Sequence, residues 1–346
     1  MKISNNKTFI VAELSANHQQ KFDIAVETIK AIKAAGADAV KLQTYTPDTL
    51  TIDCDNDYFK IKNGTIWGGK NFYELYKEAY TPWEWQPKLK KIAEDLGLIF
   101  FSTPFDFSAV DFLENMNVPI YKVASFEITD LPLIKYIAAK KKPLIISTGI
   151  AELSEIENAI NICKECENND IILLYCVSEY PAKPENINLN IIPFLKEQFK
   201  VSVGISDHSL GIEIPIAAVA LGACVIEKHF ILDKKLGGPD AEFSLDYKKF
   251  KEMVEKVRLI EKTLGKKEYK LTEAQRKNRK FGRSLFAVKD IKKGEKFTKE
   301  NIKSIRPSDG LPPLYYYQIL NKYAAIDIKY GTPLTKEMII NFEELI

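Results

Sequence analysis

The sequence has 346 residues, enough for one barrel-sized domain and a small second one. Its 46% hydrophobic and 28% charged residues are typical of a globular protein and argue against extensive disorder. The 49 basic and 47 acidic residues give a net charge of +2, so we expect no nucleic-acid partner. Any anionic ligand must then be bound by a local site.

The sequence also indicates where the protein resides. No apolar run approaches the roughly 20 residues that span a bilayer, and the N-terminus lacks the apolar core of a signal peptide. The five cysteines are an odd number in a large chain, which argues against a disulfide framework. Cys163 and Cys166 have a redox-like spacing, but they lie late in a predicted helix and no second pair completes a zinc site. We therefore expect helix packing for these two, a cytoplasmic protein and no membrane partner.

Eight short apolar, β-branched segments alternate with helical patterns along residues 1–264. Because they are nearly continuous in apolar residues, they are typical of parallel strands buried on both faces. The expected strands are Thr8–Leu14, Asp38–Thr44, Leu98–Thr103, Pro119–Ser125, Leu144–Thr148, Ile171–Val177, Val201–Ser206 and Ala223–Phe230. This α/β pattern predicts a (β/α)₈ TIM barrel over residues 1–264. A doubly wound sheet is the alternative, but no glycine-rich loop follows the first strand.

Two helices carry clear boundary signals, and a third closes the barrel pattern. An apolar stripe over 24–35 is followed by Gly36, which can end a helix in a left-handed conformation. Thr81-Pro82-Trp83-Glu84 has the pattern of a capping box with proline at the first helical position. The helix Asp246–Leu264 closes the barrel pattern.

The connection after the second strand, residues 45–80, is unusually long. Loops of this length are commonly functional or carry structure of their own. It follows the carboxyl end of a strand, where barrel enzymes have their active sites. We interpret it as a lid, with a surface subdomain as the alternative.

The composition and the pattern of the sequence change after the predicted barrel. A polar, basic stretch over 265–282 is interpreted as a linker, and residues 283–346 have short strands and turns such as DIKKGE and IKYGTPL. This predicts a compact β-rich module that is small for an independent core.

Polar side chains gather at the end of every predicted strand. Singly, each is explained as a residue that faces water, but in a barrel all eight ends meet at one mouth. The main ones are Glu13, Lys41, Gln43, Thr103, Lys122, Ser125, Glu127, Ser178, Tyr180, Ser206, His208, Glu227 and His229. Their convergence predicts an active site.

Two of the three histidines follow neighbouring strands and predict a metal site. His208 comes after the seventh strand and His229 ends the eighth, so a barrel brings both to one pocket. Two imidazoles, with a carboxylate or waters in the other positions, suit a divalent cation such as Mn²⁺. Glu227 lies on the same strand face as His229 and is expected to orient it. Hydrogen-bonded packing is the alternative for each histidine alone.

Two lysines lie inside apolar strands. Lys41 and Lys122 carry a large desolvation cost unless an anion pairs with them, and hydroxyls such as Thr103 and Ser125 are apt partners for phosphate oxygens. A Schiff-base lysine, as in some aldolases, is the alternative. Two further residues, Asp240 in a GGPD turn and Arg306 in SIRPSDG, are weak signals by themselves.

The motifs resemble the sialic acid synthase family. The resemblance rests on IVAELSANH, VKLQT, FFSTPFD, YKVASFEI, ISTG, SDHSLG and EKHF followed by GPD, with SLFAVKDIKKGE and IRPSDG in the tail. It covers essentially the whole chain. It implies a TIM barrel followed by an antifreeze-like (SAF) domain, with phosphoenolpyruvate and a 2-acetamido sugar as substrates and Mn²⁺, Mg²⁺ or Co²⁺ as cofactor.

The resemblance also assigns residues. His208 and His229 match the metal ligands; Lys41, Thr103, Lys122, Ser125, Ser178 and Ser206 match the phosphoenolpyruvate site; Glu13, Gln43, Glu127, Tyr180 and Asp240 match positions around the sugar and the reacting carbons. Arg306 matches an arginine that, in the family, enters the active site of the other subunit of a domain-swapped homodimer. Glu13, Lys122, Glu127 and Arg306 are therefore the expected catalytic residues, with Glu127 as proton donor.

Within the family, ELSANHQQ and ASFEI are most similar to the branch whose sugar is 2,4-diacetamido-2,4,6-trideoxy-L-altrose and whose product is pseudaminic acid. Sialic and legionaminic acid synthesis are the alternatives. A Schiff-base aldolase and a carbohydrate-binding protein built on the antifreeze-like tail are less favoured, because neither explains the paired histidines and lysines at one polar mouth.

Overall fold

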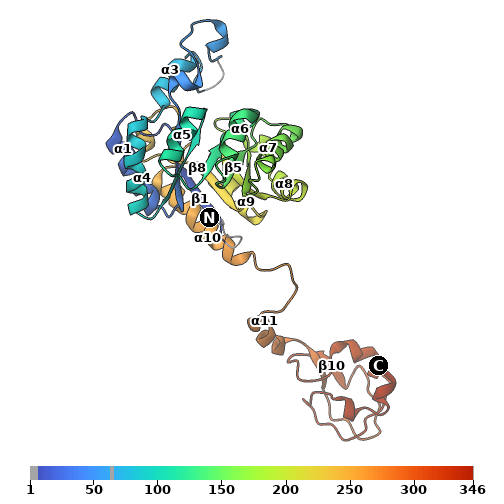
Figure 1. Ribbon diagram of the computed structural model, residues 1–346. Coiled ribbons are helices and arrows are strands. Elements are labelled where there is room, and N and C mark those ends of the chain that lie inside the picture. The colour runs from blue at the N-terminus through green and yellow to red at the C-terminus, as the bar shows by residue number, and fades with distance from the viewer. Residues whose placement is uncertain (1–6, 63–65, 346) are drawn as a thin grey trace. The chain divides into compact units, whose positions relative to one another are not determined.

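The computed structural model describes residues 7–62 and 66–345, and the chain divides into two compact units (Figure 1). The first ends at Gly265 and the second begins at Lys266. We describe each unit by itself.

The first unit is a closed barrel of eight parallel strands that pair in chain order, β1 with β2 and onward until β8 pairs with β1. The strands are β1 Phe9–Glu13, β2 Ala39–Thr44, β3 Ile99–Pro104, β4 Tyr121–Val123, β5 Leu144–Ser147, β6 Ile171–Cys176, β7 Ser202–Asp207 and β8 Val225–His229. Each lies within two residues of its predicted bounds. The TIM-barrel prediction is confirmed.

Helices surround the strands on the outside (Figure 1). They are α1 Phe22–Ala34, α4 Gln86–Asp95, α5 Phe107–Asn115, α6 Leu131–Ala138, α7 Leu153–Glu165, α8 Ile191–Phe199, α9 Glu213–Ala220 and α10 Tyr247–Thr263. Gly36, at φ +90°, follows the end of α1, as the sequence predicts. Asp246 caps α10 by accepting from the Lys249 amide. No helix among the described residues is long and apolar enough to cross a membrane.

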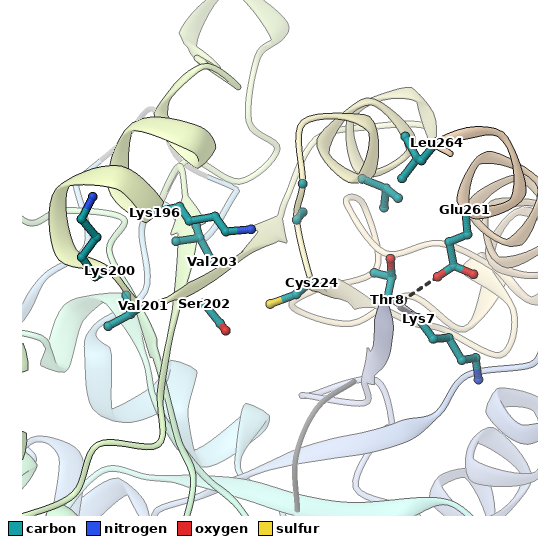
Figure 2. Close-up of a pocket in the computed structure, with 13 residues that line it drawn as sticks. Lys7, Thr8, Lys196, Lys200, Val201, Ser202, Val203, Cys224, Glu261 and Leu264 are labelled. Atoms are coloured by element: carbon teal, nitrogen blue, oxygen red, sulfur yellow. Dashed lines mark hydrogen bonds between the residues drawn. The ribbon is translucent and has the colours of Figure 1, made fainter. Parts of the chain in front are cut away.

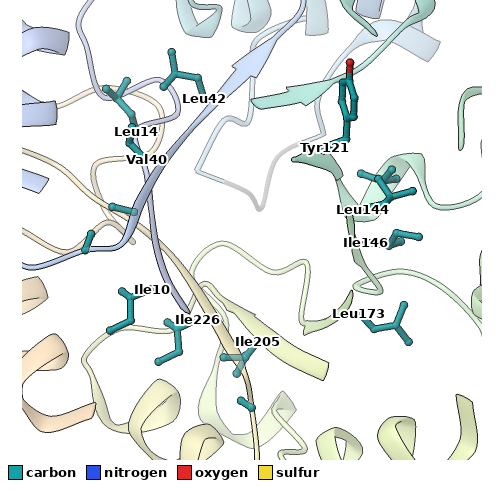
Figure 3. Close-up of a cluster of buried hydrophobic side chains, with 14 of the residues drawn as sticks. Ile10, Leu14, Val40, Leu42, Tyr121, Leu144, Ile146, Leu173, Ile205 and Ile226 are labelled. Atoms are coloured by element: carbon teal, nitrogen blue, oxygen red, sulfur yellow. The ribbon is translucent and has the colours of Figure 1, made fainter. Parts of the chain in front are cut away.

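The alternation of side chains along each strand separates two apolar clusters. Outward-facing residues such as Ile10, Leu42, Ile146 and Ile226 pack under the helices and form the main core (Figure 3). Inward-facing residues fill the lower barrel; they are Phe9, Val11, Ala39, Phe101, Ile120, Ile145, Ile172, Leu174 and Val225. Gly204 belongs to this layer because a Cβ there would meet the Val225 carbonyl at 2.4 Å. The barrel thus has a solid apolar floor below its mouth.

The predicted capping box at Thr81 is wrong. A short 3₁₀ turn, Trp83–Trp85, comes first and α4 begins at Gln86. The Thr81 hydroxyl lies 3.1 Å from Nε2 of His18 instead of capping the helix. The partner of that hydroxyl is the buried imidazole of His18, which is remote in sequence, so a local sequence pattern does not indicate it.

The segment after β2 has its own structure. It contains α2 Pro47–Leu50, the 3₁₀ turn Asp57–Phe59 and α3 Phe72–Ala79, and a bridge joins Lys60 to Asn71. In Figure 1 it projects beyond the helices that surround the strands. We call residues 45–62 and 66–80 the roof segment.

The second unit is a small β-rich module, as predicted. Strands β9 Ser284–Ala287 and β10 Ile302–Ile305 pair antiparallel, and the short helix α12 covers Tyr316–Ile319. Gly294 and Gly331 have φ of +78° and +79° in the two predicted turns. The core comprises Leu285, Ala287, Ile291, Phe297, Ile302, Leu311, Ile319, Ala324, Ile328, Leu334, Ile339 and Phe342.

The segment 265–282, interpreted as a linker, contains a helix, α11 Glu273–Asn278, which Thr272 caps. Its end belongs to the second unit, because the Ser308 hydroxyl donates to the Arg279 carbonyl and the Ser308 amide to that of Lys280.

Candidate functional site

The polar mouth lies directly above the apolar floor, on the same inward rows of the strands. Glu13 of β1 is in register with Lys41 of β2 and with His229 of β8, and Ser206 of β7 is in register with Glu227. Inward positions therefore change from apolar to ionisable within one strand. The predicted convergence of strand-end residues is what the barrel brings about.

Two buried lysines and two buried carboxylates form a network at the base of the mouth. Lys41 Nζ lies 2.8 Å from Glu13 Oε2 and 3.8 Å from Glu227 Oε2, and it donates to Thr103 Oγ1 at 3.2 Å. Lys122 Nζ lies 2.9 Å from Glu227 Oε1, which also accepts from Ser206 Oγ at 3.0 Å. The anions that offset the burial of these lysines are thus part of the protein itself.

The network corrects the role expected for Glu227. It points to the lysines and Ser206, and no hydrogen bond between it and His229 occurs in the described structure. Burial alone would raise the pKa of Glu227, but Lys122 and Lys41 lower it to about 2. Burial also raises the pKa of Glu13, against the pull of Lys41. The lysines therefore favour the charged form of Glu227, whereas burial disfavours the charged form of Glu13.

The pKa values of the two lysines are shifted in opposite directions. Burial would lower the pKa of Lys41, but Glu13 and Glu227 outweigh it and raise that pKa. Burial lowers the pKa of Lys122 despite its contact with Glu227. An anionic ligand that entered here would replace carboxylates as the partner of ammonium groups already in place.

A pair of hydroxyls lies beside the lysines. Ser125, in the 3₁₀ turn Ser125–Glu127 after β4, lies 2.7 Å from Ser178, Oγ to Oγ. Space for this pair depends on Gly149, because a Cβ there would lie 2.0 Å from Ser178 Oγ and 2.9 Å from Ser125 Cβ. Both serines were predicted; Gly149, in the ISTG motif, was not singled out.

The two predicted metal ligands are adjacent. The rings of His208 and His229 lie 5.3 Å apart, centroid to centroid. His208 Nδ1 lies 3.2 Å from the Val177 carbonyl, which orients the ring and leaves Nε2 as the potential ligand. Burial lowers the pKa of His208 to about 4 and that of His229 well below its usual range. Both imidazoles are neutral, as metal ligands must be.

His229 supplies the test of fit for a metal. Its Nδ1 is buried and has no hydrogen-bond partner among the described residues, and a carboxylate oxygen, Oδ2 of Asp240, is 3.6 Å away. Two nitrogens fit a divalent ion that takes its remaining ligands from water or substrate. Within residues 7–62 and 66–345, no group of three or more His, Cys, Asp and Glu side chains forms a closed metal cage.

Aromatic side chains surround the histidines. The Tyr180 ring lies 4.5 Å from that of His208, and Phe243, in the loop after β8, lies 4.8 Å from the His229 ring. Trp67 of the roof segment lies 5.3 Å from Tyr180 and donates its indole N–H to the Pro239 carbonyl at 2.9 Å. The roof segment therefore contacts the mouth.

Glu127 has an unusual environment for a carboxyl group. It lies in the turn after β4, and its Oε2 is buried with no hydrogen-bond partner in the described part of the chain. Burial raises its pKa to about 7, against the opposing effect of Lys122. At neutral pH the group is therefore divided between an acid and a base. Its charge in turn raises the pKa of Tyr76 in the roof segment, after burial, to about 12.

The remaining predicted residues divide between the two units. Gln43 donates to Glu13 Oε1 and to Ser15 Oγ, both at 3.0 Å, and Asp240 accepts from the Ser15 hydroxyl. Ser15 was missed, although it stands two positions after Glu13 in the ELSANH motif. Arg306 lies exposed on the loop after β10, without a partner among the described side chains of its unit.

A separate cavity lies away from the mouth. It measures about 590 Å³ and is bounded by residues at the start of β7 and β8, including Ser202 and Cys224, together with Lys196 and Glu261 (Figure 2). It is therefore at the floor end of the barrel. It contains none of the paired histidines or buried lysines, so we place the chemistry at the mouth.

Comparison with known proteins agrees with this geometry. The NeuB family matches residues 28–269 and the SAF domain matches residues 282–340. The chain is 50% identical over 331 residues to the pseudaminic acid synthase of Campylobacter jejuni, covering 96% of each chain. It is 38% identical over 327 residues to the N,N'-diacetyllegionaminic acid synthase of the same organism, covering 93% of this chain and 97% of that one.

A solved structure is similar in fold as well as sequence. The N-acetylneuraminic acid synthetase of Leptospira borgpetersenii, in complex with citrate, aligns with a TM-score of 0.71 and 34% identity. The alignment covers 80% of this chain and 91% of that one.

Proposed function

We propose that this chain, which belongs to the NeuB family and carries a C-terminal SAF domain, is a pseudaminic acid synthase. It condenses phosphoenolpyruvate with 2,4-diacetamido-2,4,6-trideoxy-L-altrose and releases phosphate. The observation that carries the choice of sugar is the 50% identity to a pseudaminic acid synthase, against 38% to a legionaminic acid synthase. The resemblance of ELSANHQQ and ASFEI to the same branch supports it.

The reaction is a transfer of a three-carbon unit. Carbon 3 of phosphoenolpyruvate attacks the aldehyde carbon of the sugar and forms the new carbon–carbon bond. Water adds its oxygen to carbon 2, and the tetrahedral intermediate expels phosphate as the bond between carbon 2 and the bridging oxygen breaks. The product is a nine-carbon 2-keto acid.

Lys41 and Lys122 bind the carboxylate and phosphate of phosphoenolpyruvate in this proposal. The ion pairs of these lysines with Glu13 and Glu227 support this assignment, because they hold both buried amino groups at the mouth. Preorganised charges of this kind stabilise a transition state without reorientation. Thr103, Ser125, Ser178 and Ser206 provide hydroxyl donors beside them.

Glu127 is the proposed proton donor. The aldehyde oxygen gains negative charge as the carbon–carbon bond forms, and a positioned acid can protonate it. A pKa of about 7 allows the group to give up a proton at neutral pH and regain it. Gln43, Tyr180 and Asp240 are proposed to hold the sugar beside it.

His208 and His229 are the proposed ligands of a divalent ion, Mn²⁺ or else Mg²⁺ or Co²⁺. The neutral rings and the unpartnered Nδ1 of His229 support the assignment. When bound, such an ion supplies Lewis-acid polarisation of the aldehyde oxygen or of water. His208 is held for this purpose by the Val177 carbonyl.

A domain-swapped homodimer completes the proposal. Arg306 is exposed and has no partner among the described residues of its own unit, which is consistent with a target elsewhere. A guanidinium offers a planar donor fork for carboxylate or acetamido oxygens. We propose that it binds substrate in the active site of the other subunit.

The test is phosphate release from phosphoenolpyruvate with Mn²⁺, with the altrose sugar and N-acetylmannosamine assayed separately, each with and without EDTA. Release with the altrose sugar alone, abolished by EDTA and restored by Mn²⁺, is the expected result. Release with N-acetylmannosamine alone would replace the sugar but keep the reaction. Borohydride trapping of a lysine adduct would instead favour a Schiff-base aldolase at Lys122 or Lys41.

A further inference from the structure

The short segment after β1, residues 15–20, is unusual in its backbone. Ser15, Gln19 and Gln20 have φ of +48°, +54° and +51°, in the left-handed region that non-glycine side chains rarely adopt. Three such residues within six positions cannot be attributed to a single tight turn. Glycine at these positions would relieve the backbone but would remove the contacts that the three side chains make.

Those contacts reach two other loops. Gln19 Nε2 donates to the Gly237 carbonyl at 2.6 Å, in the loop that carries Asp240. Gln20 Nε2 donates to the carbonyls of Glu78 at 3.1 Å and Tyr80 at 2.5 Å, at the end of the roof segment. One loop thus holds the loops that follow β2 and β8.

Neighbouring residues strengthen both attachments. The backbone N–H of Gln20 donates to His18 Nδ1 at 3.1 Å. Nε2 of this buried neutral ring therefore carries the proton and donates it in a hydrogen bond to the Thr81 hydroxyl. Asn17 donates to the Phe230 carbonyl at 2.9 Å and to Ser244 at 2.8 Å. Gly238 permits the close approach, because a Cβ there would lie 2.5 Å from Gln19 Nε2.

The two loops held in this way carry the side chains that cover the mouth. The roof segment contributes Trp67, against Tyr180 and the Pro239 carbonyl, and Tyr76, near Glu127. The loop after β8 contributes Asp240 and Phe243, beside His229. The lysine network and the Ser125–Ser178 pair lie on the strands and in the segments that follow β4 and β6. The side chain of Gln20 donates to the roof segment and forms no hydrogen bond with them in the described structure.

We propose that residues 15–20 act as a clasp, and that Gln20 is a positioning residue that fixes the sugar end of the site by holding the roof segment. The assignment of that end to the sugar rests on the proposed function. Gln20 acts through the roof segment and touches none of the reacting atoms. Loss of its amide should therefore weaken sugar binding and leave phosphoenolpyruvate binding intact.

Gln20→Gly is the deciding variant, because it relieves the left-handed backbone but removes the side-chain hydrogen bonds to the roof segment. Glycine adopts the left-handed backbone without strain, so local conformation predicts a barrel at least as stable as the wild type. The clasp predicts an increase of about tenfold in the KM for the sugar, as expected when two ordinary hydrogen bonds are lost. The KM for phosphoenolpyruvate should change by less than about twofold in the same variant.

Two further variants separate the causes. Gln20→Glu keeps the shape but replaces the donor by an acceptor that faces two carbonyls, so it should match or exceed the effect of Gln20→Gly. Lys200→Gly is the matched control: Lys200, at φ +56°, is exposed after α8 at the floor end of the barrel. It should change neither KM.

Amide hydrogen exchange provides a readout that needs no substrate. Because Gln20 holds the carbonyls at the end of α3, Gln20→Gly and Gln20→Glu should increase exchange over 72–80 by about tenfold and leave α7 unchanged. Wild-type exchange over 72–80 in both variants would overturn the clasp, as would equal increases in both KM values. A wild-type enzyme inactive with the altrose sugar would refute the proposed function instead, and exchange would still decide the clasp.

Discussion

Replacement of Glu127 by glutamine should change the pH dependence of stability in a defined direction. Burial raises the pKa of Glu127 from 4.5 to about 7. Between these values the folded protein holds the proton more tightly than the unfolded chain, so the contribution of Glu127 to stability falls as the pH rises through this window. At about 1.4 kcal/mol per pKa unit, ionised Glu127 costs up to about 3 kcal/mol above pH 7.

Glutamine cannot ionise, so Glu127→Gln should be more stable than the wild type at pH 8 by up to about 3 kcal/mol and equally stable near pH 4.5. Urea unfolding followed by tryptophan fluorescence measures this difference in the barrel, because Trp67, Trp83 and Trp85 all lie in the first unit. The other ionisable groups are common to both proteins and cancel. A stability difference that does not grow between pH 5 and pH 8 would refute the account of Glu127.

Three further predictions concern other parts of the molecule. Lys228→Ala should destabilise the barrel by about 3–5 kcal/mol in urea unfolding, because it leaves buried Asp207 without its ion pair; an unchanged midpoint would contradict this. Gly149→Ala should lower kcat/KM for phosphoenolpyruvate about a hundredfold, because the new Cβ displaces Ser178; full activity would remove the serine pair from the site. Arg306→Ala should lose activity without a change in barrel unfolding. His229→Ala should also be inactive, and mixing the two variants should restore activity if Arg306 acts across a dimer. No restoration would argue for action within one subunit.

The barrel could be predicted because its strands carry two signals at once. Segments such as Leu144–Ser147 are apolar on both faces, and each is followed by polar residues where the chain leaves the sheet. Chain order then determines which strands are neighbours, so the proximity of His208 and His229 followed from topology alone.

Partners across the barrel could not be predicted in the same way. Glu227 and His229 share a strand face, but Lys122 and Lys41 reach Glu227 from β4 and β2 and outweigh that proximity. Thr81 satisfied the local pattern of a cap, but His18 took its hydroxyl. The contacts of Gln19 and Gln20 with carbonyls of distant loops have no sequence pattern, since any residue presents a carbonyl.

The choice of sugar and the bond that breaks can be tested in one measurement. Phosphoenolpyruvate labelled with ¹⁸O at the bridging oxygen is supplied in limiting amount to the Mn²⁺-loaded enzyme. N-acetylmannosamine and 2,4-diacetamido-2,4,6-trideoxy-L-altrose are present in equal amounts. The masses of the acid and phosphate products are determined by mass spectrometry. We expect a nine-carbon acid from the altrose sugar only, with the label in phosphate. An acid derived from N-acetylmannosamine, or label retained in the acid, would contradict it.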